Sequence, residues 1–158
     1  MTLFTLPATF VYPVPVSLIP AVSAALTRQN TLQANRIISS SFRLIALFSL
    51  PAGVGLSVLA QPILQLLYPA VPDTAAAYHL QILGAAAVFV CLMILTNAIL
   101  QACGRVYVPI VTALIGGAVK ISTTYTLCGN PVFGIKGAPI STTACYAVIA
   151  VLNLCVLA

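Results

Sequence analysis

The stretch VYVPIVTALIGGAVKISTTYTLC, residues 106–128, decides the fold of this chain. It is apolar along most of its length, has no acidic residue, and carries one charge, that of Lys120. A helix of about 20 mostly apolar residues crosses a bilayer, so the stretch predicts a transmembrane helix. A lysine inside such a helix costs roughly 3 kcal/mol to insert, so the direction in which its side chain points has to be explained.

The composition of the whole chain also favours a membrane protein. The 158 residues are 61% hydrophobic and 4% charged, whereas a soluble domain carries about 25% charged residues. The net charge of +5 comes from six basic residues scattered among apolar runs, which form no basic stripe for nucleic acid. The five cysteines include no CxxC pair, which argues against a disulfide framework or a zinc site.

Four further stretches have the length and apolarity of membrane spans, and prolines lie within the first two of the five spans. These prolines are expected to kink the helices, either to shape the bundle or to provide bending points for transport. They are Pro7, Pro13, Pro15 and Pro20 in the first span and Pro51 in the second. The predicted fold is an all-α integral membrane protein, a single membrane domain with five transmembrane helices. The predicted spans are residues 3–26, 41–59, 78–103, 106–128 and 135–158.

The distribution of basic residues predicts the orientation of the chain. The longest polar segment, residues 27–43, is expected to form a short amphipathic helix along the membrane surface. It carries three arginines, and the turn after the third span carries one more, whereas the alternate connections hold Lys136 and the single acid Asp73. The positive-inside rule places the N-terminus outside and the C-terminus in the cytoplasm. The arginines predicted to face the cytoplasm are Arg28, Arg36, Arg43 and Arg105.

The neighbours of Lys120 on its helix face are mostly small or hydroxylated. Within roughly 60° of Lys120, at 100° per residue, lie Pro109, Ala113, Gly116, Gly117, Thr123, Thr124 and Leu127. Small residues let helices approach closely, so the lysine is expected to point into the protein. Its charge would then meet helix carbonyls, cavity water, an acid outside this segment or an anionic ligand. The alternative is that the side chain extends toward the outer interface.

Other polar residues in the spans fit packing or a polar cavity. Asn97 and Gln101 are four residues apart on one face, which favours an interhelical hydrogen bond slightly over cavity lining. Asn153 is expected to bond a neighbouring helix. One acid and one histidine cannot supply paired groups for acid–base catalysis, so the chain is not expected to be an enzyme. No metal constellation or cofactor motif is present in the sequence.

The order of these segments resembles a known family. The first span ends in SLIPAVSAAL, which is followed by the basic segment. Then come FRLIALFSLPAGVGLSVLAQPILQLLYP, NAILQACGRVYVPIVTALIGGAVKI and IKGAPISTTACYAVIAVLNL. Together they resemble the C-terminal half of polysaccharide biosynthesis proteins of the stage V sporulation protein B type. That type belongs to the superfamily of multidrug and oligosaccharidyl-lipid/polysaccharide exporters, which includes peptidoglycan-precursor flippases.

The resemblance covers nearly the whole chain and implies a piece of a larger transporter. Members have about fourteen spans in two lobes around a cavity, and this chain would match spans eight to twelve. They move lipid-linked sugars across the bacterial plasma membrane by alternating access. The implied partners are the lipid-linked sugar, the bilayer and the family's N-terminal lobe. The expected function is flipping of a lipid-linked oligosaccharide or peptidoglycan precursor for the cell envelope or the spore wall.

The resemblance also bears on the site. A cationic side chain suits the pyrophosphate of such a substrate, and sporulation-type members tend to carry lysine at the position that Lys120 matches. Peptidoglycan-precursor flippases tend to carry a basic residue before the prolines of the first of these spans, where this chain has Thr2 and Leu3. Two other functions stay open, a multidrug exporter of the superfamily and a non-transporting membrane fragment that needs a partner. The predicted substrate-binding residues are Lys120, Thr123, Thr124, Asn97 and Gln101.

Overall fold

The structure, a computed structural model, describes residues 6–67, 74–128 and 137–157, and all regular structure in these ranges is α-helical. The helices are α1 (Leu6–Val11), α2 (Pro13–Thr27), α3 (Thr31–Val58), α4 (Ala60–Leu67), α5 (Thr74–Ala102), α6 (Tyr107–Cys128) and α7 (Gly137–Leu157). Five stretches are long and apolar enough to cross a membrane: Ala8–Thr27, Thr31–Val58, His79–Ala102, Tyr107–Leu127 and Pro139–Leu157. The prediction of an all-α membrane protein with five spans is confirmed.

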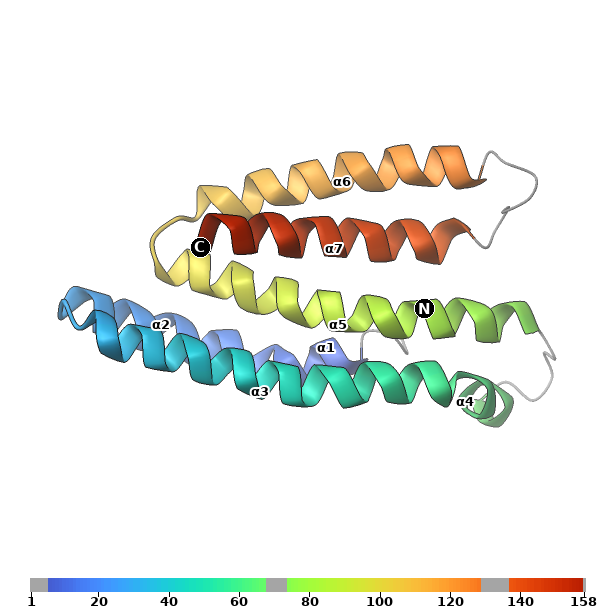
Figure 1. Cartoon of the computed structure of the whole chain (residues 1–158), viewed down its shortest axis with the longest axis horizontal. Coiled ribbons are helices and arrows are strands. Elements are labelled where there is room, and N and C mark those ends of the chain that lie inside the picture. Colours follow the sequence, from blue (N-terminus) through green and yellow to red (C-terminus); the bar gives the residue numbers. More distant parts are fainter. Residues whose placement is uncertain (1–5, 68–73, 129–136, 158) are drawn as a thin grey trace.

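Helix α5 is the centre of the bundle. It packs against α3 and α7 most extensively and also against α2. The long helices run side by side, with α7 and then α6 on one side of α5 and with α2 and α3 on the other (Figure 1). Over their apolar stretches, 61% of the residues of α5 are buried but only 11% of those of α6. Therefore α5 forms the core, and α6 is a peripheral helix held mainly through α7.

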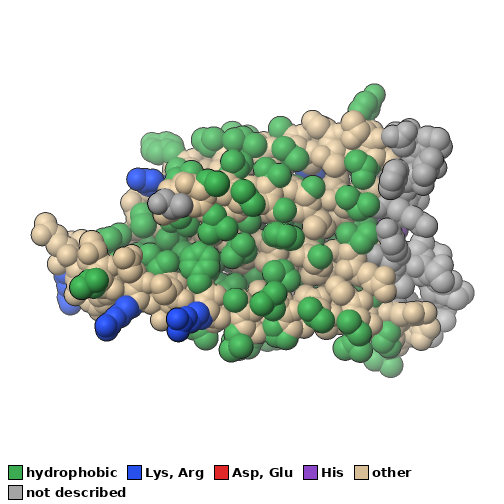
Figure 2. All heavy atoms as spheres, viewed as in Figure 1, with side chains coloured by type: hydrophobic (Ala, Val, Ile, Leu, Met, Phe, Trp, Pro, Cys, Tyr) green, Lys and Arg blue, Asp and Glu red, His purple; other side chains and the backbone are tan. Residues whose placement is uncertain are grey.

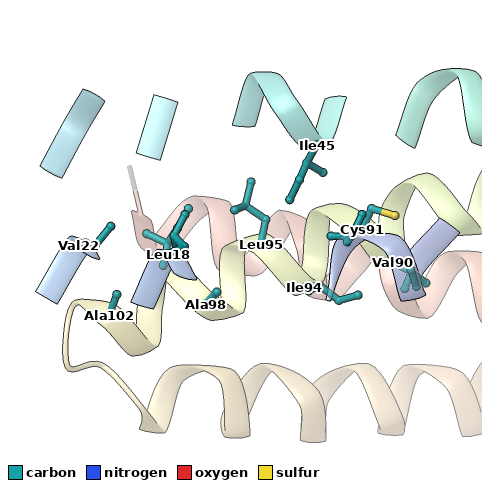
Figure 3. Packing of buried hydrophobic residues seen from close by; sticks show 12 residues of the cluster. Leu18, Val22, Ile45, Val90, Cys91, Ile94, Leu95, Ala98 and Ala102 are labelled. Atoms are coloured by element: carbon teal, nitrogen blue, oxygen red, sulfur yellow. The ribbon is translucent and has the colours of Figure 1, made fainter. Parts of the chain in front are cut away.

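The largest apolar cluster lies where α5 meets α2 and α3. Leu18 and Val22 come from α2, Ile45 comes from α3, and Leu95 and Ile99 come from α5, and all are buried. Figure 3 shows labelled members of this cluster between the ribbons of these helices. Lipid tails are as apolar as these side chains, so burial against protein brings little hydrophobic gain in a bilayer, and dense packing must hold the helices together instead.

Prolines divide the first predicted span into two helices. Helix α1 ends at Val11, Tyr12 forms a turn, and α2 begins at Pro13. Tyr12 keeps helical dihedral angles, with φ −52° and ψ −35°, but Pro13 and Pro15 have no N–H to donate to the preceding turn, and proline is well accommodated in the first turn of a helix. Pro20 and Pro51 instead lie inside α2 and α3. The break therefore falls where the prolines are most closely spaced.

The connection between α2 and α3 is much shorter than predicted. The sequence predicted a separate surface helix over residues 27–43, but α3 begins at Thr31 and continues unbroken to Val58. Asn30 caps the helix, because its side chain accepts a hydrogen bond from the Gln33 N–H over 3.1 Å. Gln29 has a positive φ of 55° in the tight turn before the cap. The polar segment is therefore mostly the first turns of a long membrane helix.

Helices α3 and α5 approach each other most closely at two glycines. A Cβ atom on Gly84 would collide with Ser57 Oγ and lie 2.8 Å from the Gly53 carbonyl oxygen. A Cβ atom on Gly53 would lie 2.9 Å from the Gly84 oxygen. Ser57 Oγ donates hydrogen bonds to the Gly53 oxygen over 2.9 Å and to the Gln81 oxygen over 3.1 Å. These contacts require glycine at both positions, because any side chain would separate the backbones.

The glycine contact predicts opposite outcomes for two substitutions of the same type. Gly84→Ala should destabilise the fold by about 1–3 kcal/mol, because the added methyl overpacks the contact with α3. Gly55→Ala, whose Cβ would meet nothing within 4 Å, should be neutral or slightly stabilising, since alanine is the better helix former. Unfolding of the purified protein in mixed micelles, followed by circular dichroism, measures both. Equal stability of the two variants would contradict the close contact.

Candidate functional site

The candidate site is built on one face of α7. Ser141, Cys145, Ile149 and Asn153 follow one another at four-residue spacing, and all four are buried. Residues at this spacing form a single row along a helix. Each successive member of the row is displaced by about 40° around the helix axis. We call this row the α7 ridge. Its first three members contact α6 and its last contacts α5, so one row of side chains joins three helices.

Two residues of α6 make the contact with the α7 ridge. Thr124 Oγ1 donates a hydrogen bond to Ser141 Oγ over 2.8 Å. A Cβ atom on Gly116 would collide with the side chain of Ile149 and lie 3.4 Å from Cys145 Sγ. The missing side chain at Gly116 therefore lets α6 come close to α7. The neighbouring Gly117 has open space where its Cβ would be.

Lys120 lies between these two contacts, one turn from each. Gly116, Lys120 and Thr124 share the four-residue spacing of one helix face, yet the side chain of Lys120 is exposed in this chain. Thr123 is half-buried and Ala113 is exposed. The predicted small-residue face thus packs against α7 at Gly116 and Thr124, while Lys120 emerges at the α6–α7 contact and remains accessible.

No acidic side chain balances the charge of Lys120 in the described part of the chain. The single acid of the sequence, Asp73, lies outside the described residues, as does Lys136. The group beside Lys120 on α6 that could assist an anion is the hydroxyl of Thr123, because Thr124 already donates its hydroxyl proton to Ser141. An ammonium group with an adjacent hydroxyl donor can hold an anion by charge-assisted hydrogen bonds.

Two tyrosines on α6 indicate how deep Lys120 lies in the bilayer. Tyr107 and Tyr125 are each 83% exposed, and tyrosine is enriched at membrane interfaces. Their separation along the helix corresponds to a rise of about 27 Å, close to the hydrocarbon thickness of about 30 Å. Lys120 is then about 7.5 Å from the level of Tyr125. Its charge therefore lies in one half of the bilayer, on the side away from the α5–α6 turn.

Asn97 takes part in a hydrogen bond between helices. Asn153 Nδ2 on α7 donates to Asn97 Oδ1 over 2.7 Å and to Thr96 Oγ1 over 3.3 Å. Asn153 Oδ1 is buried and has no hydrogen-bond partner among the described residues. The prediction that Asn153 bonds a neighbouring helix is confirmed. Asn97 is half-buried, and Gln101, one turn further on, is exposed.

The five predicted substrate-binding residues therefore fall into two groups. Lys120, Thr123 and Thr124 lie on α6, whereas Asn97 and Gln101 lie on α5. The α7 ridge connects the groups through Thr124–Ser141 and Asn97–Asn153. Ser141 was missed by sequence reasoning, although the four-residue spacing from Ser141 to Asn153 was a signal that could have found it.

The described arginines gather at one end of the bundle. Arg28 follows α2, and Arg105 lies in the α5–α6 turn, where its Nη1 donates a hydrogen bond to the Val156 oxygen of α7 over 3.4 Å. Arg36 and Arg43 lie in the first half of α3. In Figure 2 most of the visible blue side chains lie toward the end where α2 meets α3. These residues thus form a basic end, and Lys120 lies apart from it.

Metal-ligand chemistry is not seen in the part of the chain that the structure describes. No group of three histidine, cysteine or acidic side chains lies together among those residues. Cys91 and Cys145 are buried and free, and Cys103 and Cys155 are exposed and free. The chemistry that the site offers is therefore a cation with hydroxyl and amide groups.

The five membrane-length helices define a multi-pass α-helical membrane protein. Comparison with known proteins shows its family, because the family described as Lipid II flippase MurJ matches residues 2–158. The chain belongs to this family. The match agrees with the superfamily predicted from the sequence, while the finer assignment to the stage V sporulation protein B type stays a prediction.

One curated relative is the "Uncharacterized membrane protein YabM" of Bacillus subtilis (strain 168), which is 30% identical over 152 residues. The alignment covers 96% of this chain and 28% of the relative. The chain thus spans less than a third of the length of that protein. No solved structure matches the chain.

The hydrogen bond between α5 and α7 predicts energetic coupling. In a double-mutant cycle, Asn97→Ala and Asn153→Ala should couple by about 0.6 kcal/mol, the mean found for interhelical hydrogen bonds in membrane proteins, and by no more than about 1.7 kcal/mol, the largest value found. The stability of each variant can be measured by unfolding in mixed micelles. A cycle of Asn97→Ala with Asn35→Ala, an exposed residue of α3, serves as the control and should show no coupling. Equal coupling in both cycles would show that the Asn97–Asn153 bond carries no specific energy.

Proposed function

We propose that this chain is part of a flippase that moves a lipid-linked peptidoglycan precursor across the bacterial plasma membrane by alternating access. The observation that carries the proposal is the match of residues 2–158 to the lipid II flippase family. Proteins of this family are transporters, so no catalytic residues are assigned. The same proposal includes a role in spore-wall synthesis and the transport of other lipid-linked oligosaccharides. The sugar that the lipid carries is part of the proposal as well.

In this proposal Lys120 meets the pyrophosphate of the precursor. The substrate carries negative charge at the junction of its sugar and its lipid, and that charge has to pass through the bilayer. An exposed ammonium about 7.5 Å inside the level of Tyr125 offers a charge-assisted contact in the outer half of the path. The hydroxyl of Thr123 is close enough along α6 to add a hydrogen bond, and Thr124, which donates its proton to Ser141, would offer the substrate only its oxygen as an acceptor. Asn97 and Gln101 would contact the sugar from α5.

The proposal needs further helices beside those described. Alternating access requires two bodies that rock against each other around a site, and the chain spans 28% of the relative named above. An N-terminal lobe is therefore proposed as the partner that closes the cavity. The chain can bend at Tyr12, where α1 ends and α2 begins. Helix α6 can shift, because it is peripheral and contacts mainly α7.

The main competing function is a multidrug exporter of the same superfamily. Exporters that couple to ions usually use carboxylates inside the membrane, and the one acid of this sequence, Asp73, lies in no predicted span. The family match and the unbalanced cation both favour an anionic lipid-linked substrate over a cationic drug.

Substrate binding by the purified chain tests the role of Lys120. Native mass spectrometry in mild detergent, with lipid II as the probe, should show a complex whose affinity falls about tenfold or more in Lys120→Ala, because a hydrogen bond to a charged group is lost. Lys120→Arg should retain most of the affinity, since the charge is kept. Arg28→Gln, which removes one positive charge at the basic end, is the matched control and should bind as the unmodified chain does.

Unchanged binding in Lys120→Ala would remove the lysine from the proposed site. An equal loss in Arg28→Gln would show that net charge, and not Lys120, attracts the lipid. Transport itself is measured with the chain joined to the N-terminal lobe, where Lys120→Ala should abolish flipping while the protein still inserts.

The basic end is proposed to face the cytoplasm, with the N-terminus of this segment outside. The clustering of Arg28, Arg36, Arg43 and Arg105 supports this orientation through the positive-inside rule. The exposed Cys103 lies beside Arg105 in the α5–α6 turn. Chemical labelling of the Cys103 thiol therefore shows on which side of the membrane the basic end lies.

Thiol labelling in cells tests this orientation. A variant that keeps Cys103 and replaces the other four cysteines with alanine should react with a membrane-impermeant maleimide only after the cells are opened. A matched control carries Gln61→Cys in a background without native cysteines, because Gln61 is exposed on α4 beyond the opposite end of α3. That cysteine should react in intact cells. The reverse labelling pattern would invert the topology.

A further inference from the structure

Helix α2 carries a backbone oxygen that its own hydrogen bonds do not satisfy. In an α-helix each carbonyl accepts from the N–H four residues later, and proline has no N–H. Pro20, inside α2, therefore leaves the carbonyl oxygen of Val16 without its helical donor. Val16 and Pro20 are both exposed. The Val16 oxygen thus lies on the face of α2 that no described helix covers.

The hydroxyl groups of α2 do not replace the missing donor. Ser17 Oγ, one residue after Val16, donates to the Val14 oxygen over 3.0 Å. Ser23 and Thr27 likewise donate to other main-chain oxygens. A carbonyl without a partner is costly in the hydrocarbon layer, where no water can bond it. The Val16 oxygen therefore needs a donor from outside the described residues.

Val16 lies deep in the membrane. The helical rise from Val16 to Arg28, at the basic end, is about 18 Å, which is more than half of the hydrocarbon thickness of about 30 Å. Backbone groups without helical partners are tolerated at this depth where they are buried in protein or line a polar cavity. The face of α2 around Val16 therefore has to meet a polar group inside the protein, and not acyl chains.

The side chains beside the Val16 oxygen leave it open. Ser17, Pro20 and Ala24 share the exposed face with Val16, and all three have compact side chains. The exposed residues of α2 between Pro13 and Ala24 include no leucine, isoleucine or phenylalanine, which are the residues that insertion into lipid favours. A ligand can therefore reach the oxygen.

The second half of α3 provides a comparison on a surface suited to lipid. Pro51 leaves the Leu47 oxygen without its helical donor in the same way. The adjoining Phe48 and Leu50 are large and exposed, so their side chains can shield that oxygen. The two helices share the backbone feature, and on α2 the oxygen is unshielded.

The face around Val16 offers acceptors and no charge. Ser17 Oγ has donated its proton to the Val14 oxygen, so what it presents to a ligand is a second acceptor. Two oxygens with partial negative charge attract donors and repel an anion such as pyrophosphate. Another helix has its N–H groups in its own backbone bonds, whereas a sugar is rich in neutral O–H and N–H donors. Tyr12, one turn before Val16, is 57% exposed and adds an aromatic ring.

We propose that the face of α2 around Val16 and Ser17 is an uncharged acceptor site for the sugar part of the lipid-linked precursor. The Val16 main-chain oxygen and Ser17 Oγ accept hydrogen bonds from hydroxyl or amide N–H groups of the sugar, and the Tyr12 ring packs against it. The inference rests on the proposed function, because it takes a sugar-bearing lipid as the substrate. It uses neither Lys120 nor the pyrophosphate.

Removal of the free acceptor tests the site. In Pro20→Ala the new N–H bonds the Val16 oxygen within the helix. Native mass spectrometry in mild detergent compares two probes, lipid II and undecaprenyl pyrophosphate, which keeps the lipid and the pyrophosphate but has no sugar. Pro20→Ala should lower the affinity for lipid II about threefold or more, as expected for one lost hydrogen bond, and leave undecaprenyl pyrophosphate unaffected. Pro51→Ala is the matched control and should bind both probes as the unmodified chain does.

A second replacement separates the acceptor from the shape of the helix. Lactic acid in place of Pro20, the ester analogue of alanine, removes the proline ring but supplies no N–H. The Val16 oxygen then stays free, so this variant should keep the affinity of the unmodified chain for lipid II. A loss equal to that in Pro20→Ala would show that the ring acts through the shape of α2, and it would overturn the acceptor role.

The ratio of the two affinities distinguishes this inference from the proposed function. Binding of undecaprenyl pyrophosphate depends on Lys120 in the proposed function, whereas the ratio depends on the sugar site. An unchanged ratio in Pro20→Ala, with both probes bound, would overturn the sugar site alone and is the result expected if lipid or another helix covers this face. An equal loss for both probes would also overturn it, because the effect would not depend on the sugar.

Discussion

Close approach of helices through residues with little or no side chain is the constraint on which the rest of this structure depends. In a bilayer, burial of apolar side chains against protein brings little gain, because lipid is an equally good solvent for them. Van der Waals contact and short hydrogen bonds must then hold the helices together. Gly53 and Gly84 bring α3 onto α5, and Gly116 brings α6 onto α7. The serine and threonine hydrogen bonds beside these glycines, at Ser57 and at Thr124, become possible at this distance.

The position of the candidate site follows from this packing. Helix α6 contacts the rest of the bundle mainly through α7, so most of its surface stays free of protein in this chain. Lys120 emerges between the two points at which α6 is fixed, Gly116 and Thr124. Lys120 is thus on a helix that packs against α7 along one face, while its other faces contact no other described helix extensively. This arrangement can hold a cation at a defined depth while leaving it accessible to a ligand or to a further helix.

The sequence predicted the helices well and their contacts less well. Runs of apolar residues are enough to identify five spans, because the bilayer sets their length. The polar segment after the first span was assigned to a separate surface helix, although α3 runs through it from Thr31. Hydropathy follows the membrane boundary, whereas a helix continues as long as its backbone hydrogen bonds do. Asn153 was identified as an interhelical residue, but its partners Asn97 and Thr96 depend on which helices are neighbours, and local sequence does not show this.

The α7 ridge has a consequence for how this protein can vary. Cys145 and Ile149 contact one neighbouring helix, and Asn153 contacts the other, although all lie in one row. A larger side chain in the row would push α7 away from one neighbour and toward the other at the same time. Substitutions there would need matching changes on two helices that hardly touch each other. Related sequences should therefore show correlated replacement of α5 and α6 positions with no direct contact between them, which a search for contacts from covariation would misread as an α5–α6 interface.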